Sequence, residues 1–74
     1  MGEETKVKIE LVLKLQTIST DRDFLLSVIN YAQNIEDRKT VIKFIDDGKD
    51  VTYENVILLA LTLYEEREQE STMQ

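Results

Sequence analysis

Hydrophobic and polar residues alternate along residues 6–16, and a period of two is typical of a β-strand with one buried face. The apolar side of this pattern consists of Val7, Ile9, Leu11, Leu13 and Leu15. A helix is the alternative, because helical spacing is also matched by Val7, Leu11, Leu15 and Ile18. We favour the strand, because a helix that buries Val7 would leave Ile9 and Leu13 exposed to water.

The next segment has the spacing of an amphipathic helix. Apolar residues recur there at steps of three and four, at Phe24, Leu25, Val28, Ile29, Ala32 and Ile35. Thr20 is a suitable N-cap, and the acids that follow it, Asp21 and Asp23, are favoured near the positive end of a helix dipole. The pattern predicts a helix of about 13 residues that packs one face against the rest of the domain.

The stretch after the four charges of residues 36–39 is predicted to form a β-hairpin. Residues 40–45 are rich in β-branched and aromatic side chains, which favour strands. Asp47-Gly48 between apolar runs is a hairpin-turn signal, and residues 50–53 would form the returning strand. The alternative is a short helix over residues 36–47 that ends with Gly48 as its C-cap.

The last predicted element is a helix that follows Thr52, a suitable N-cap, and runs from Tyr53 to a charged tail at residues 65–70. On a helical wheel the apolar residues from Leu59 round to Leu61 cover an arc of about 200°, which is more than one packing face requires, and Leu58 lies outside even that arc. Three of them form surplus hydrophobic surface, which usually marks an interface: Ile57, Leu61 and Tyr64. We expect residues 1–5 and 69–74 to fray.

Together these elements predict a single small domain over residues 1–74 of the α+β class. The order β-α-β-β-α gives one sheet covered by two helices, and the alternative is an all-α bundle of three or four helices. A chain this short buries only about 60% of its unfolded surface, so its core is marginal unless it gains area by oligomerising.

Composition narrows the chemistry that this domain can perform. Its 74 residues include 15 acids, 9 bases and neither histidine nor cysteine, which gives a net charge of −6. Zinc, iron–sulfur and haem ligation by those residues, thiol chemistry and a histidine general base are therefore excluded. Asp46, Asp47 and Asp50 lack the spacing of a calcium loop, and there is no glycine-rich phosphate loop. We expect no enzyme activity, catalytic residue, metal, cofactor or small-molecule substrate.

Charge and apolar runs also bear on partners and location. Nucleic acid is not the expected partner, because phosphate binding draws on an excess of Lys and Arg. The DNA-binding alternative is a ribbon–helix–helix dimer whose first strand would present Lys6, Lys8 and Lys14. The longest apolar stretch, residues 56–61, is far shorter than the roughly 18 residues of a membrane span. With no signal-peptide pattern and no cysteine, we expect a cytoplasmic protein.

One stretch resembles a known family. Residues 48–57 read Gly-Lys-Asp-Val-Thr-Tyr-Glu-Asn-Val-Ile. They look like the hairpin-to-helix segment of HPr, the phosphocarrier of the bacterial sugar phosphotransferase system, which typically reads Gly-Lys-x-Val-Asn-x-Lys-Ser-Ile-Met. Gly48, Lys49 and Val51 match outright. The resemblance covers about residues 6–64 and implies an HPr-like fold.

The chain departs from that family at its functional residues. The loop at residues 18–23 has no counterpart of the active histidine, Asn55 occupies the position of the regulatory serine, and the family's fourth strand and last helix are missing. The resemblance implies a degenerate relative that cannot be phosphorylated, with a partner surface around the starts of the two helices. The corresponding positions are Arg22, Tyr53, Asn55, Ile57 and Ala60, to which the helical wheel adds Leu61 and Tyr64. For the apolar ones, core packing is the alternative.

The sequence thus predicts a non-catalytic protein–protein interaction or regulatory domain. Its partner is expected to be another protein chain, most simply a second copy in a homodimer. The wide apolar arc of the last helix is the surface through which we expect the chain to associate.

Overall fold

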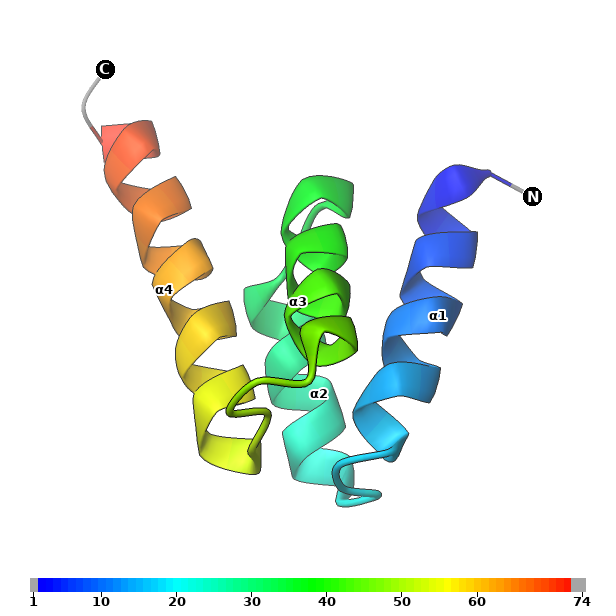
Figure 1. The fold of residues 1–74 in the computed structure, drawn as a ribbon. Helices are drawn as coiled ribbons and strands as arrows, with labels where there is room; N and C mark the ends of the chain where they lie inside the picture. Colours follow the sequence, from blue (N-terminus) through cyan, green and yellow to red (C-terminus); the bar gives the residue numbers. More distant parts are fainter. Residues whose placement is uncertain (1, 73–74) are drawn as a thin grey trace.

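The computed structural model describes residues 2–72, and these form four helices without a strand (Figure 1). The helices are α1 (Glu3–Gln16), α2 (Arg22–Tyr31), α3 (Ile35–Asp47) and α4 (Tyr53–Thr72). The expected α+β fold, with one sheet covered by two helices, is therefore wrong for the described residues. They form the four-helix arrangement that the sequence left as the alternative.

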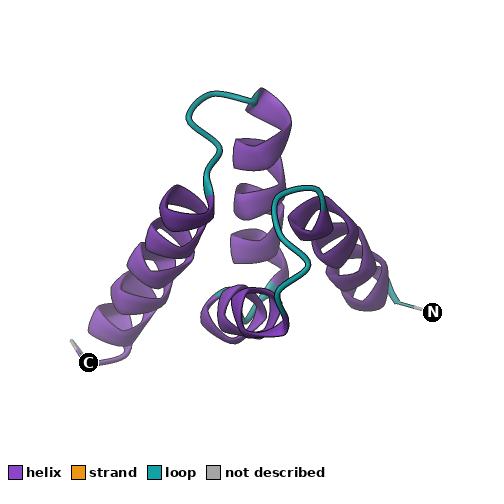
Figure 2. Cartoon of the chain, turned by 90° about the horizontal axis from the view of Figure 1, so that it is seen from below, coloured by secondary structure: helices purple, strands orange, loops and turns teal. Residues whose placement is uncertain are grey.

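The helices run alternately down and up, and α1 and α4 lie on opposite sides of α2 and α3 (Figure 1). The view from below in Figure 2 also shows the two flanking helices apart from each other. The most extensive contacts join α1 to α3 and α2 to α4. Because the direction alternates along the chain, the two helices of each of these pairs are parallel to each other. Helices that follow each other in the sequence share less extensive contacts.

The first helix replaces the strand predicted over residues 6–16. Val7, Leu11 and Leu15 are buried, as the helical alternative requires, whereas Ile9 and Leu13 are 50% and 59% exposed. The alternation arose because α1 has apolar residues on two sides, one toward the core and one toward solvent. A helix of this kind imitates the period of a strand, and periodicity alone does not distinguish the two.

Two ion pairs fix α1 alongside α3. Lys39 Nζ in α3 donates a hydrogen bond to Glu3 Oε1 at the start of α1 (2.5 Å), and Lys14 Nζ donates to Asp46 Oδ1 near the ends of both helices (2.6 Å). The hydrogen bonds are the main reason why the pKa of Glu3 is lowered and the pKa of Lys14 is raised. All four side chains are more than a third exposed, so the pairs orient the helices and add little stability.

The helix predicted after Thr20 is confirmed, with different ends. Its cap is Asp21 rather than Thr20, and the Asp21 carboxylate accepts a hydrogen bond from the Asp23 N–H at 3.4 Å. The helix ends at Tyr31, so that Ile35 belongs to the next element. A helix of 10 residues therefore stands where we expected about 13.

A helix also replaces the hairpin predicted over residues 40–53. Asn34 caps the start of α3 through its Oδ1, which accepts a hydrogen bond from the Asp37 N–H at 2.9 Å. Gly48 ends the helix in the left-handed conformation, with φ of 71°, and Val41 between the two caps is fully buried. The caps and the burial outweigh the strand preference of the β-branched residues, because that preference depends strongly on context.

Replacing Gly48 by alanine should destabilise the domain. A residue with a Cβ pays about 1–2 kcal/mol for the left-handed conformation, even though a Cβ at this position would meet no atom within 4 Å. We expect the midpoint of thermal unfolding to fall by about 4–16 °C, because each kcal/mol lowers it by about 4–8 °C in a domain of this size. Gly48→Asn is the matched control and should retain most of the stability, because asparagine tolerates positive φ. Equal midpoints for Gly48→Ala and the wild type would show that this helix end does not require a left-handed residue.

The last predicted helix is confirmed. Thr52 caps it as expected, because its Oγ1 accepts a hydrogen bond from the Asn55 N–H at 3.1 Å. The helix has 20 residues and extends further than predicted. Of the ends that we expected to fray, residues 3–5 and 69–72 are helical and Gly2 is the extended residue before α1. Met1, Met73 and Gln74 lie outside the described residues.

All four helices contribute to one hydrophobic core. Its largest fully buried side chains are Leu11 and Leu15 from α1, Phe24 and Val28 from α2, Val41 from α3 and Val56 from α4. Phe24 also stacks on Tyr53 at the start of α4, with the ring centroids 4.5 Å apart. The core therefore connects the two flanking helices through the central pair.

The described chain does not have the HPr-like fold that the resemblance implied. The segment that looked like the hairpin of HPr, at residues 48–52, connects α3 to α4, and residues 2–72 contain no sheet. The ribbon–helix–helix alternative loses its basis for the same reason. Its predicted strand over residues 6–16 is part of a helix.

Candidate interaction surface

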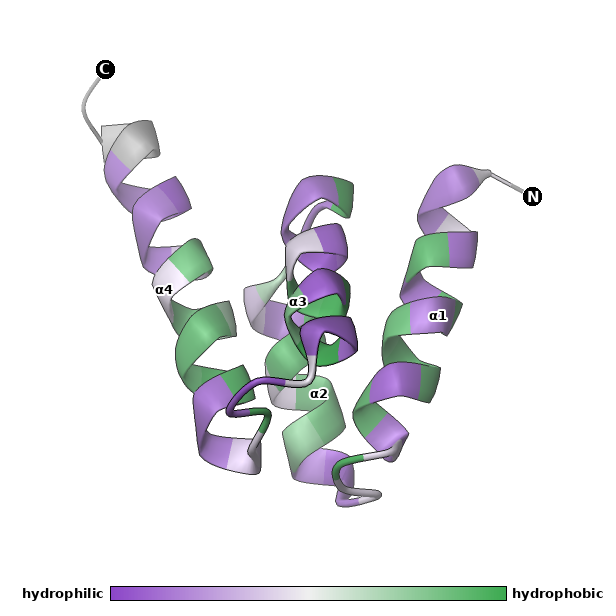
Figure 3. Cartoon of the chain, in the orientation of Figure 1, coloured by the Kyte–Doolittle hydropathy of each residue, from purple (hydrophilic) through white to green (hydrophobic). Residues whose placement is uncertain are grey.

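The side of α4 that faces away from the core is hydrophobic in its first half. Leu58 is 61% exposed, and Leu61, almost one turn further along, is half-buried. The exposed acids Glu54 and Glu65 extend the same stripe, because steps of four, three and four residues stay on one side of a helix. We call these four residues the α4 outer face. Figure 3 shows the hydrophobic stretch of α4 and the hydrophilic end that follows it.

Two of the predicted partner-binding residues on α4 contribute to the core. Ala60 has no exposed surface, and Ile57 is half-buried and packs against the core cluster. Core packing, which was the alternative for the apolar positions, therefore describes Ala60 completely and Ile57 in part. Leu61 is the member of that predicted set that lies on the α4 outer face.

The two predicted tyrosines pack against α2. Tyr53 stacks on Phe24 with an interplanar angle of 25°, and Tyr64 contacts Tyr31 at a tilt of 50° with the centroids 5.6 Å apart. These contacts join the starts of α2 and α4 and also their later turns, which keeps the helices parallel. Tyr53 remains 40% exposed, so its ring is also accessible from outside.

The two polar residues of the predicted set lie at helix starts. Arg22 is the first residue of α2 and is exposed. Asn55 lies in the first turn of α4, where its side-chain amide donates a hydrogen bond to the Asp50 carbonyl at 2.7 Å. Asp50 has a positive φ of 54°, so this hydrogen bond supports an unusual turn before α4. The role of Asn55 in the structure is therefore to hold the connection between α3 and α4.

A second hydrophobic surface lies on α1, where the sequence predicted a strand. Ile9 and Leu13 are half or more exposed, Val12 between them is half-buried, and the exposed Lys6 and Lys8 flank them. We call these five residues the α1 outer face. The signal that could have identified it was present in the sequence, because residues 6–16 are apolar at both the inner and the outer helical positions. The α1 and α4 helices lie on opposite sides of the bundle (Figure 1).

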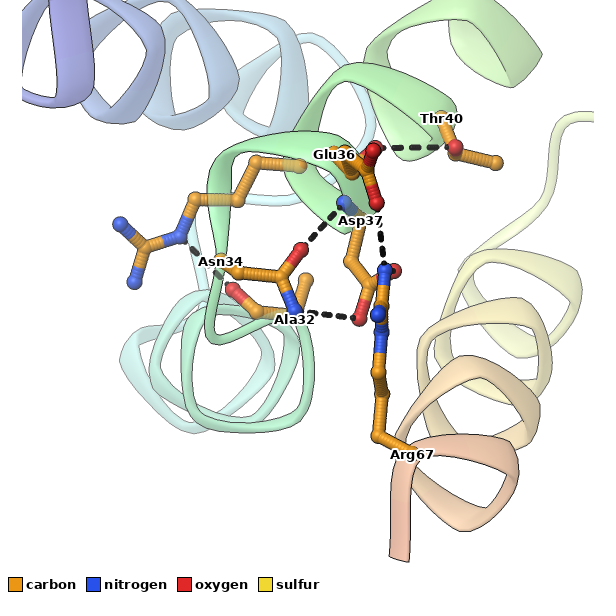
Figure 4. A network of polar contacts seen from close by, with 7 residues as sticks. Ala32, Asn34, Glu36, Asp37, Thr40 and Arg67 are labelled. Atoms are coloured by element: carbon orange, nitrogen blue, oxygen red, sulfur yellow. Dashed lines mark hydrogen bonds and ion pairs between the residues drawn. The ribbon is translucent and has the colours of Figure 1, made fainter. Parts of the chain in front are cut away.

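A polar cluster joins the start of α3 to the last turns of α4 (Figure 4). Arg67 Nη2 donates hydrogen bonds to Glu36 Oε2 at 2.8 Å and to Asp37 Oδ1 at 3.3 Å. Asn34 Nδ2 donates to the other oxygen of Asp37, also at 3.3 Å. The hydrogen bond to Glu36 and then the one to Asp37 raise the pKa of Arg67, which therefore stays charged. The Asp37 side chain is only 5% exposed, so its carboxylate is the buried member of the cluster.

The geometry of this cluster is structural rather than catalytic. Glu36 and Asp37 both hydrogen-bond to an arginine, which cannot exchange a proton with them near neutral pH. The neighbouring Arg38 is 8% exposed, and its Nε donates to the Ala32 carbonyl at 2.7 Å. Among the described residues, no buried side-chain polar atom lacks a hydrogen-bond partner. Nor does this part of the chain contain three or more acidic residues grouped so that they could hold a metal ion.

Two further findings concern the chain as a whole. None of the helices within residues 2–72 combines the length and the apolar character that crossing a bilayer demands. Comparison with protein-family models, with curated proteins and with solved structures finds no match.

Proposed function

We propose that this protein is a non-catalytic, cytoplasmic interaction domain that self-associates through the α4 outer face. The observation that carries the proposal is the exposure of Leu58 beside Leu61, on a helix whose opposite side already builds the core. Apolar surface gains about 25 cal/mol for each Å² that leaves water. A chain of 74 residues has little core area, so burial in a second copy is a substantial addition.

The surface of α3 provides the contrast that supports this proposal. Its exposed positions are polar: Glu36, Lys39, Thr40, Lys43, Asp46 and Asp47. A helix that only covers a core has such a solvated side. The two leucines of the α4 outer face depart from that pattern, which favours an interface at this helix.

The non-catalytic and cytoplasmic parts of the proposal rest on composition and on the polar cluster. The chain has neither histidine nor cysteine, and the carboxylates of Glu36 and Asp37 are hydrogen-bonded to Arg67. A protein without cysteine is compatible with the reducing cytoplasm.

Leu58→Asp should abolish self-association without unfolding the chain. A carboxylate buried at the contact would lose its hydration without gaining a partner, whereas in the monomer the side chain lies in water. We expect sedimentation of the wild type to show association that increases with concentration and the variant to remain monomeric. Circular dichroism should show the same helix content for both proteins.

Asn30→Asp is the control for this experiment. Asn30 is exposed on α2, and the substitution makes the same change in charge away from the α4 outer face. It should self-associate like the wild type. A wild-type chain that stays monomeric at the highest concentration reached would contradict the proposed function, and so would equal association of Leu58→Asp and the control.

A further inference from the structure

The two outer faces differ in the charge that surrounds their apolar residues. On α1, the exposed Lys6 and Lys8 flank Ile9, Val12 and Leu13. On α4, the exposed Glu54 and Glu65 lie at the two ends of the Leu58–Leu61 pair. The α4 outer face is therefore bordered by acids, whereas two lysines and one acid, Glu10, border the apolar residues of α1, so the net charges of the two surfaces are opposite.

We propose that the α4 outer face of one molecule binds the α1 outer face of a second copy of this chain. The inference rests on the proposed function, because it names the surface that the α4 outer face recognises. Leu58 and Leu61 would pack against Ile9, Val12 and Leu13, and the lysines of one copy would lie near the glutamates of the other. Such charge complementarity selects the partner and the register of a contact.

Charge disfavours the two symmetric alternatives. A contact between two α4 outer faces would bring Glu54 and Glu65 of both copies together, and a contact between two α1 outer faces would do the same with Lys6 and Lys8. Like charges placed together in an interface are strongly unfavourable. Each chain also carries a net charge of −6, so two copies repel each other unless the contact pairs opposite charges.

The spacing of the two faces is also compatible. The α4 stripe follows steps of four, three and four residues through 54, 58, 61 and 65, and α1 follows the same steps through 5, 9, 12 and 16. Stripes with this spacing lie along one side of a helix and allow two helices to pack lengthwise. Glu10, the acid in this part of α1, lies on the side of Lys14, which binds Asp46 of α3, and so at the edge of the outer face.

The contact must form between molecules. The α1 and α4 helices lie on opposite sides of α2 and α3, so the outer faces of one chain do not meet (Figure 1). Because the faces differ, the contact is heterologous, and each molecule offers one of each kind. Two short helical faces form an interface below the standard size of about 1,200–2,000 Å², so the association is weak and depends on concentration.

Complementation between two variants tests this pairing. Ile9→Asp damages the α1 outer face, and Leu58→Asp damages the α4 outer face. We expect each variant alone to show a dissociation constant for self-association at least about tenfold higher than that of the wild type. An equimolar mixture should form a 1:1 complex, because the intact α4 outer face of Ile9→Asp can bind the intact α1 outer face of Leu58→Asp. Sedimentation of the two variants, alone and mixed, measures all three cases. The control is Asn30→Asp, which leaves both outer faces intact and should self-associate like the wild type.

The outcomes separate this inference from the proposed function. If Ile9→Asp associates like the wild type while Leu58→Asp is monomeric, the α4 outer face binds another surface, and only the pairing is overturned. If both variants associate like the wild type, the proposed function fails as well. Two monomeric variants whose mixture forms no complex would also overturn the pairing.

A second variant tests the pairing without placing a charge among apolar residues, a change that could affect folding. Lys8→Glu changes an exposed residue at the rim of the α1 outer face, so folding should be unaffected. Its dissociation constant should exceed that of the wild type at low salt, and the difference should shrink as salt is added. An unchanged dissociation constant at low salt would overturn the electrostatic pairing of the two faces.

Discussion

Phe24→Ala is expected to lower the free energy of unfolding by about 3–5 kcal/mol, the usual cost of truncating a large aromatic side chain in a core. Phe24 has no exposed surface, and its ring stacks on Tyr53 of α4. The substitution therefore leaves a cavity and removes a contact between α2 and α4. A chain of 74 residues has a total stability of about 4–11 kcal/mol. The variant should be close to the limit at which the domain remains folded.

Urea denaturation followed by circular dichroism measures this effect. Leu26→Ala is the matched control, because Leu26 lies on the same helix but is 46% exposed. Its effect should stay within about 0.5 kcal/mol. If both variants unfold at the urea concentration of the wild type, Phe24 does not occupy the centre of the core.

Asp37→Ala should cost about 2 kcal/mol, more than an ordinary surface substitution. The Asp37 carboxylate is 5% exposed and accepts hydrogen bonds from Asn34 and Arg67. It also lies in the first turn of α3, where the helix dipole favours a negative charge. Its removal weakens the start of α3 and its connection to α4 at the same time.

Glu36→Ala is the control for this substitution, because Glu36 binds the same arginine. Its side chain is 82% exposed, so the effect should be no more than about 1 kcal/mol and should decrease with salt. The Asp37→Ala effect should persist at high salt, since a buried pair is screened less. Thermal unfolding of both variants at low and high salt makes the comparison, and equal losses would show that burial of Asp37 has no energetic role.

The sequence predicted the two helices whose apolar residues have one consistent spacing. Phe24 and Val28 in α2 and Ala32 at its C-cap are fully buried, as their steps of four require, and Thr52 caps α4 as expected. The strands predicted at residues 6–16, from alternation, and at residues 40–53, from β-branched composition and a turn signal, are wrong. In α3 the deciding information is in the two caps, Asn34 and Gly48. The sequence pattern indicated Gly48 as a possible C-cap but not Asn34 as an N-cap.

The candidate surface could be predicted only in part. Leu61 was identified because the apolar arc of α4 is wider than one packing face, but Leu58 lay outside that arc. The alternation predicts Ile9 and Leu13 on the buried side of a strand, because a helix that buries Val7 leaves both of them exposed, and the structure has them exposed. The pairing of Arg67 with Glu36 and Asp37 joins residues about 30 positions apart, and no local pattern reveals such a contact.

The parallel pairing of α1 with α3 and of α2 with α4 has a consequence for folding kinetics. The contacts between α1 and α2, and those between α3 and α4, are less extensive than the contacts across these pairs. Neither half of the chain is therefore a self-sufficient helical hairpin. The most extensive contacts form only after the chain has closed a loop that spans an intervening helix, which raises the contact order above that of a simple sequential bundle. We therefore expect the domain to fold and unfold as one cooperative unit, because loss of either flanking helix deprives a central helix of its main partner.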